Sequence, residues 1–236
     1  MRTVRVILCV LCLAWAVSAQ AKTYLVCVGV ADYPGIRKDL KVSANDARTI
    51  QGIFQKNGQA TVSALTNSQA TIQNVCSRME SVFAQAKAND NIILYFSGHG
   101  IPGGLCCYDG SLLYKTVFEI MKRSQAKNKI ILVDACYAGK MRSTSQSSNK
   151  YANENVMFFL SSRTNELSLE SPYNNSLFTI FLERGLRGGA DANRDKCITA
   201  RELYSFVHTG VVEASKKRQH PVMWGKFNND MPIIKW

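Results

Sequence analysis

Two polar, glycine-rich turns contain the strongest candidates for reactive residues in this sequence. His99 lies in the turn at residues 97–100, and Cys136 lies in the turn at residues 134–139. A cysteine thiolate attacks carbonyl carbon well, and a nearby imidazole can take the thiol proton and later protonate a leaving amine. His99 and Cys136 are therefore a candidate base and nucleophile.

Glycines in both turns suit the same chemistry. An oxyanion must be approached closely by backbone N–H groups, and Gly100 and Cys136 could donate them. The alternative is that His99 is a hydrogen-bonded turn histidine and Cys136 a buried thiol. That alternative is favoured for either residue alone, but the occurrence of both in matching turns favours a catalytic pair.

The elements that must hold these turns alternate between strands and amphipathic helices. Strands are expected at residues 23–30, 61–65, 91–96, 129–133, 156–160 and 231–235, and helices at residues 43–56, 72–86, 113–121, 176–186 and 199–212. Continuous apolar strands separated by helices are typical of a parallel sheet covered on both faces. We therefore expect one α/β domain at residues 23–236, with an exposed polar linker at residues 140–153.

The two turns follow the strands expected at residues 91–96 and 129–133. Catalytic groups gather at the carboxyl ends of the strands of an open parallel sheet. Right-handed connections make these two strands plausible neighbours. His99 and Cys136 would then face the same crevice.

Length and charge restrict the classes of function. The chain has 236 residues and 46% apolar content, which is enough for one buried core. The formal net charge is +12, but the basic residues are scattered and cluster tightly only at residues 216–218. We therefore expect no nucleic-acid partner.

The amino terminus has the pattern of a secretory signal peptide. Arg2 and Arg5 precede an apolar run at residues 6–17, which is followed by small residues at a cleavage site. We predict that residues 1–19 are removed and that the mature protein is periplasmic or secreted. The apolar run is shorter than the roughly 20 residues that span a bilayer, so no membrane span is expected.

Six cysteines remain after that cleavage: Cys27, Cys76, Cys106, Cys107, Cys136 and Cys197. An even number permits disulfides in an exported chain, but the chain is far longer than the small scaffolds that depend on them. Cys27 and Cys76 fall at apolar positions of expected elements, where cysteine packs as a small hydrophobic residue. The adjacent pair suggests either a redox switch or ordinary packing, and packing is favoured.

Several motifs together resemble the caspase-like cysteine peptidases, especially the metacaspase and bacterial caspase-homologue branch. They lie at residues 29–30, 32–33, 45–47, 95–100, 134–139, 177–179 and 219–222. The resemblance implies a three-layer α/β fold with a mainly parallel, about six-stranded sheet covered by helices on both faces. It also implies a His99/Cys136 dyad with no obligatory third member, acting on protein or peptide substrates.

The same resemblance implies a pocket for a basic side chain. Asp46, Asp134 and Ser97 match residues that line this pocket, and Ser43 stands where that branch often has cysteine. Asp46 has an alternative role, because residues 43–46 also form a capping-box pattern that would place it at the third position of a helix. Asp134 ends an apolar strand and has no local cap to form.

A third pattern lies near the carboxyl terminus. Positions 1, 3, 5, 7, 9 and 12 of a calcium-loop pattern are occupied by Asp191, Asn193, Asp195, Cys197, Thr199 and Glu202. Lys196 replaces the glycine usual at position 6, and residues 199–202 also form a capping box that would begin a helix. The capping box is favoured over calcium. His208 and His220 have no partners at zinc spacing, so structural roles are expected.

These observations favour an exported cysteine endopeptidase that cleaves after Arg or Lys. We expect no required cofactor, a monomer, and self-processing in the linker at Lys140, Arg142 or Lys150. One alternative is a catalytically silent scaffold with the same fold. Another is a calcium-dependent binding module centred on residues 191–202.

Overall fold

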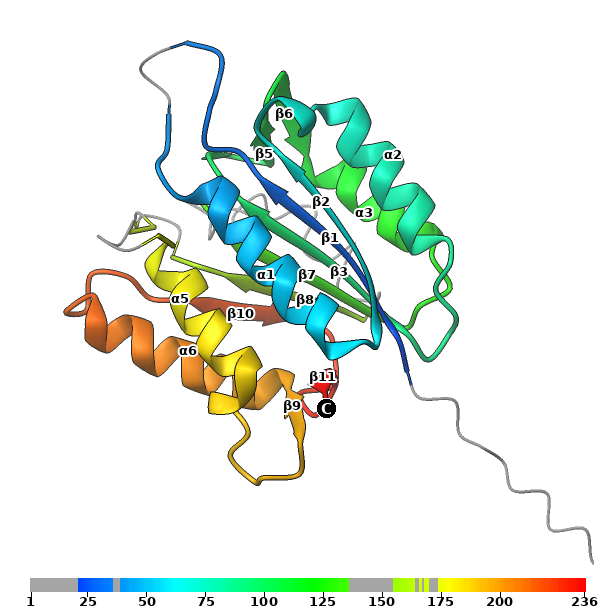
Figure 1. Cartoon of the computed structure of the whole chain (residues 1–236), viewed down its shortest axis with the longest axis vertical. Helices are drawn as coiled ribbons and strands as arrows, with labels where there is room; N and C mark the ends of the chain where they lie inside the picture. The colour runs from blue at the N-terminus through cyan, green and yellow to red at the C-terminus, as the bar shows by residue number, and fades with distance from the viewer. Residues whose placement is uncertain (1–20, 36–38, 136–154, 164–165, 167, 170–173) are drawn as a thin grey trace, which may run out of the picture.

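A computed structural model describes residues 21–35, 39–135, 155–163, 166, 168–169 and 174–236. Its centre is a six-stranded sheet in the order β10-β8-β7-β3-β1-β2 (Figure 1). These strands are β1 (Thr23–Gly29), β2 (Ala60–Thr66), β3 (Asn91–Ser97), β7 (Asn128–Asp134), β8 (Val156–Leu160) and β10 (Val222–Gly225). β10 pairs antiparallel with β8 and the other pairs are parallel, which confirms the expected sheet.

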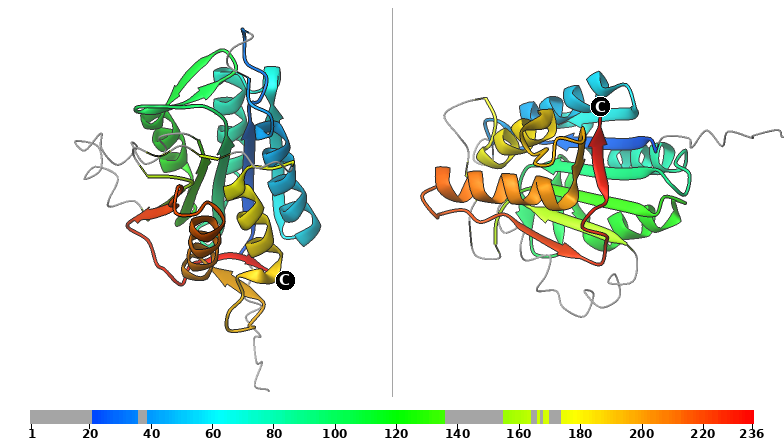
Figure 2. Two further views of the ribbon diagram at one scale, coloured as in Figure 1. Left: turned by 90° about the vertical axis from the view of Figure 1, so that its left-hand side faces the viewer. Right: turned by 90° about the horizontal axis from the view of Figure 1, so that it is seen from below.

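Helices cover both faces of this sheet (Figure 2). One face carries α1 (Ser43–Asn57), α5 (Leu177–Arg184) and α6 (Ala200–Ala214), and the other carries α2 (Ile72–Phe83) and α3 (Tyr114–Arg123). Short helical turns, η1 (Asn67–Gln69) and η3 (Gly185–Gly189), follow β2 and α5. The three-layer fold is confirmed. Within the described part of the chain, no helix is long and apolar enough to cross a membrane.

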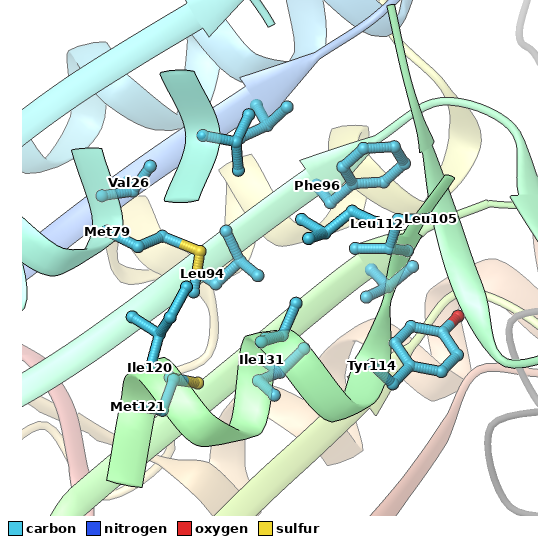
Figure 3. Packing of buried hydrophobic residues seen from close by; sticks show 14 of the residues in the cluster. Val26, Met79, Leu94, Phe96, Leu105, Leu112, Tyr114, Ile120, Met121 and Ile131 are labelled. Carbon is cyan, nitrogen blue, oxygen red and sulfur yellow. The ribbon is translucent and has the colours of Figure 1, made fainter. Parts of the chain in front are cut away.

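The continuous apolar strands are explained by burial on both sides. Along β3, Leu94 and Phe96 join the core beneath α2 and α3, whereas Ile93 and Tyr95 join the core beneath α1, α5 and α6. Successive side chains of a strand point to opposite faces, so a strand between two helical layers needs apolar residues at every position. Figure 3 shows the first of these cores, with Met79 of α2 close to Leu94.

A small antiparallel sheet after β3 was not expected from the sequence. It consists of β4 (Gly100–Ile101), β5 (Gly104–Cys107) and β6 (Gly110–Leu113). Gly103 turns β4 into β5 with a φ of 87°, a conformation that favours glycine. Leu105 and Leu112 anchor the small sheet on the core (Figure 3). Its strands are too short for a clear alternation, so periodicity did not reveal them.

The carboxyl-terminal strand differs from the expectation in its partner. The strand expected at residues 231–235 is present as β11 (Pro232–Lys235), but it pairs with β9 (Cys197–Thr199) outside the main sheet. The sixth strand of the main sheet is β10, which the sequence did not predict. β10 has four residues and ends at a glycine, so it is shorter than the patterns that periodicity detects.

Candidate active site

The carboxyl ends of β3 and β7 lie side by side and carry the predicted site. Ser97 pairs with Asp134 across the two strands, and the Gly98 amide donates to the Asp134 carbonyl at 3.1 Å. His99 therefore comes two residues after Ser97. Cys136 comes two residues after Asp134 but lies outside the described residues, as does the linker at residues 140–153.

Tyr33, in the loop after β1, holds the His99 turn. Its hydroxyl accepts the His99 backbone N–H at 2.9 Å and donates to the Cys106 carbonyl at 3.0 Å. The two rings lie 4.9 Å apart at 41°. A Cβ at Gly98 would lie 2.6 Å from the same hydroxyl oxygen, so glycine is needed there. The sequence indicated Tyr33 only as part of a family motif, because this contact joins loops 66 residues apart.

Asp46 lies on the first turn of α1 and is fully buried. Its carboxylate accepts hydrogen bonds from the Ser97 hydroxyl at 2.8 Å, the Asn175 side-chain amide at 2.9 Å and the Ser176 backbone N–H at 3.0 Å. The residue that caps α1 is Val42, and no side chain caps the helix. The capping-box alternative for Asp46 is therefore wrong, because tertiary partners occupy both carboxylate oxygens.

Asp134 ends β7 and is surrounded by hydroxyl groups. Ser168, Ser176 and Thr179 donate to its carboxylate, the last at 3.1 Å. The Thr179 oxygen also lies 2.6 Å from the Tyr95 hydroxyl, which must donate because Thr179 uses its only hydrogen on Asp134. Ser176 thus contacts both aspartates, through its N–H to Asp46 and its hydroxyl to Asp134.

The two buried carboxylates are costly to ionise together. Burial and the nearby charge of Asp134 raise the pKa of Asp46 to about 7. Burial also raises the pKa of Asp134, although its hydroxyl donors oppose the shift. An opposite charge placed between two such groups favours their ionised forms. The site is therefore arranged to gain stability from a cation.

A cavity of about 40 Å³ brings the predicted pocket residues together. We call it the carboxylate cavity; the sequence-predicted residues that line it are Ser43, Asp46, Ser97, His99 and Asp134. Ala135, the residue before Cys136, also lines it, as do Ser168 and Leu169, which come between β8 and α5 in the sequence. Residues from five separate parts of the chain thus meet beside His99.

Gln219 holds Leu169, which lines this cavity. It is fully buried, its side-chain oxygen accepts the Leu169 N–H at 3.0 Å, and its amide donates to the Ser161 carbonyl at 2.9 Å. His220 contacts the same segment, because its Nδ1 lies 2.8 Å from the Glu166 carboxylate. Local periodicity did not show these contacts, since the partners are 50 or more residues apart.

Gly100 lies in the β4–β5 pair with its amide turned away from the ladder. The Cys106 N–H donates to the His99 carbonyl at 2.9 Å, so Gly100 and Leu105 form a non-hydrogen-bonded pair. In such a pair the backbone groups point away from the partner strand. The β4–β5 ladder therefore does not use the Gly100 N–H.

The calcium-loop pattern forms a turn that leads into α6. Thr199 and Glu202 make a full capping box, which confirms the expected helix start. Asp191 and Asn193 accept the Asp195 N–H, and Asp195 accepts the Cys197 N–H. Lys196 adopts a φ of 64°, as the glycine usual at this position would. The described residues contain no group of three or more His, Cys, Asp or Glu arranged to hold a metal ion.

The remaining candidates lie in packing positions. The described cysteines are thiols: Cys27, Cys76, Cys106, Cys107 and Cys197. Burial raises the pKa of the Cys107 thiol to about 12, so it is protonated at neutral pH. His208 packs against Tyr204 with the ring centres 5.3 Å apart.

Comparison with known proteins identifies the fold family. The model of the caspase domain family matches residues 22–231. Among solved structures, a crystal structure of protein GSU0716 from Geobacter sulfurreducens is similar, with a TM-score of 0.68 and 17% identity over 91% of this chain and 97% of that one. No curated protein matches the sequence. The matched region spans nearly the whole described chain, and the chain therefore belongs to the caspase domain family.

Proposed function

We propose that this protein is a cysteine endopeptidase that cleaves peptide bonds after Arg or Lys. The observation that carries the proposal is the convergence of two buried carboxylates, Asp46 and Asp134, beside His99. Family membership supports a cysteine peptidase-type fold. The paired carboxylates support a cationic side chain as the group that is bound next to the scissile bond.

In the proposed reaction, His99 takes the thiol proton of Cys136, and the thiolate attacks the carbonyl carbon of the substrate. The C–N bond then breaks, the proton passes from His99 to the leaving amine, and the acyl group stays on sulfur as a thioester. Water hydrolyses the thioester with His99 as base and restores the thiol. The N–H groups of Gly100 and Cys136 would hold the oxyanion.

Specificity would follow from the carboxylate cavity. A guanidinium between Asp46 and Asp134 gains two charge-assisted interactions, whereas a substrate aspartate would meet like charges. Arg should be preferred over Lys where the carboxylates allow bidentate contact. Ser97 supports this role because its hydroxyl orients Asp46.

The proposal extends to processing and export. Lys140, Arg142 and Lys150 lie in a polar segment that an enzyme with this specificity could cut in itself. Residues 1–19 would direct export to the periplasm or beyond, and the mature protein would act as a monomer. No cofactor is needed in this scheme, since a thiol and an imidazole supply the nucleophile and the acid–base group, and full activity in excess calcium chelator would support it.

The decisive experiment compares Cys136→Ala, His99→Ala and the double variant on matched peptides with Arg, Lys or Asp before the scissile bond. Each single change should abolish most turnover, and the double variant should be little worse, because the two residues act as one unit. Cys197→Ala and His208→Gln are matched controls and should retain activity. Additive losses would refute a shared dyad.

Two further readouts separate the enzyme from a silent scaffold. A thiol-reactive probe should label Cys136 in the folded protein, and absence of labelling would favour the scaffold. Wild type should also show two fragments that Cys136→Ala lacks. Efficient cleavage after Asp would overturn the specificity while leaving the dyad in place.

A further inference from the structure

A second, larger cavity also has His99 in its lining. It has a volume of about 610 Å³ and lies between the loop after β1 and the small sheet β4–β6. We call it the hairpin cavity; the residues that matter here are Tyr33, His99, Ile101, Tyr108, Asp109 and Ser111. His99 lines both this cavity and the carboxylate cavity. The two spaces therefore meet at the candidate base.

The direction of a bound peptide follows from the chemistry at His99. The imidazole must reach the leaving nitrogen in order to protonate it, so the chain after the scissile bond lies on the imidazole side. The side chain before the scissile bond occupies the carboxylate cavity under the proposed function. The chain after the bond then runs past His99 into the hairpin cavity.

The lining of the hairpin cavity favours apolar side chains. Tyr33 and Tyr108 supply aromatic surface, and Ile101 supplies aliphatic surface. Apart from His99, the one charged residue among the described lining residues is Asp109, whose carboxylate already accepts the Ile72 N–H at 2.8 Å at the start of α2. Apart from His99, no basic side chain of the described lining would attract an acidic residue. The volume lies within the roughly 300–1,000 Å³ typical of ligand sites.

We propose that the hairpin cavity is a subsite for the two residues that follow the scissile bond and that it selects an apolar or aromatic side chain there. This inference rests on the proposed function. It adds a second specificity element, which acts on the leaving peptide rather than on the acyl group. The carboxylate cavity and the hairpin cavity would together select the side chains before and after the cleaved bond.

The first test varies the substrate. Matched quenched fluorescent peptides carry Arg before the scissile bond and Phe, Ala or Glu at the two positions after it. A peptide methyl ester ending in Arg serves as the reference, because its leaving group is methanol and cannot fill the hairpin cavity. We expect kcat/KM to be at least about tenfold higher with Phe than with Glu, with Ala between them.

The second test fills the cavity. Ser111 is exposed on β6 and lines the cavity, so Ser111→Trp adds bulk without disturbing the core. Ser111→Trp should lower kcat/KM for the Phe peptide at least about tenfold and remove the preference over Glu, while hydrolysis of the methyl ester stays within about twofold. Leu113→Trp is the matched control, because Leu113 is exposed on the same strand and is not among the lining residues.

The outcomes distinguish the two proposals. Ester hydrolysis with equal cleavage of the Phe and Glu peptides would overturn the subsite and leave the peptidase intact. An unchanged Phe preference in Ser111→Trp would also overturn it. Failure of wild type to hydrolyse either the ester or any Arg peptide would overturn the peptidase and, with it, the subsite.

Discussion

The two cavities that have His99 in their lining differ in size and in the chemistry of their walls. The carboxylate cavity is small, about 40 Å³, and contains two buried carboxylates that are held by at least six hydrogen-bond donors. The hairpin cavity is about 610 Å³ and has aromatic walls with one carboxylate, already hydrogen-bonded, in its lining. The first is suited to one charged group in a fixed geometry, and the second to apolar groups of varied shape.

The difference reflects the elements that build each side. Asp46 and Asp134 project from a helix and a central strand, which hold charged groups in place. The hairpin cavity is formed by loops and by strands of two to four residues at the end of the main sheet (Figure 1). Recognition of a charged group requires that the binding side chains be held rigidly, because a buried charge must lie close to an opposite charge and to hydrogen-bond partners. Apolar contact is non-directional and tolerates a looser frame.

The largest expected effect concerns charge in the carboxylate cavity. Asp46→Asn and Asp134→Asn should each lower kcat/KM for Arg peptides by about 100-fold or more, because a guanidinium would lose a buried partner. Asp230→Asn removes a carboxylate from an exposed ion pair with Arg201 and should change activity less than twofold. Cleavage after Arg at the wild-type rate in both pocket variants would show that this cavity does not recognise the charge of the substrate side chain.

A smaller effect is expected from pH. Since burial and the charge of Asp134 raise the pKa of Asp46 to about 7, KM for an Arg peptide should rise about fivefold as pH falls from 7 to 6. Protonated Asp46 no longer attracts a cation. Steady-state kinetics from pH 5 to 9 measure this dependence, and Asp46→Asn should lose it while keeping the titration of kcat. An identical KM profile in both proteins would contradict the assignment.

The same group affects stability with a defined sign. The folded protein keeps a proton on Asp46 up to about pH 7, whereas the unfolded chain releases it near the ordinary value of 3.8. The free energy of unfolding should therefore fall as pH rises through this window. In Asp46→Asn this part of the pH dependence should be absent in denaturant titrations.

The smallest expected effect concerns Tyr33, which holds the turn of His99, the residue that lines both cavities. Tyr33→Phe removes the hydroxyl that accepts the His99 N–H and donates to the Cys106 carbonyl. We expect kcat to fall about tenfold with KM within about twofold, because the imidazole is displaced while the carboxylates stay in place. Tyr204→Phe makes the same chemical change on α6 and should leave both constants near wild type. A fall in kcat that disappears when rates are divided by the concentration of probe-labelled Cys136 would indicate a loss of folded protein rather than of positioning.

Much of the framework was predictable from local pattern. Continuous apolar strands and amphipathic helices predicted the sheet, because burial on both faces requires apolar residues at every strand position. Polar turns after two such strands placed His99 at a sheet edge. The capping box at Thr199 and Glu202 was also predictable, since its partners lie three residues apart. Family motifs, rather than periodicity, pointed to Asp46 and Asp134.

The sequence by itself thus determined the parallel strands β1, β2, β3, β7 and β8, the helices that cover them, their order and the chemical types at the strand ends. Only the tertiary structure decided which groups meet: Ser176 bridges two aspartates, Tyr33 holds the His99 turn, and Gln219 holds the Leu169 segment. It also decided that β10, not β11, completes the main sheet. The physical reason is the distance along the sequence between the residues that make contact. Periodicity and caps record contacts within a few residues, whereas these contacts join segments 42 to 130 residues apart that meet only when the layers pack.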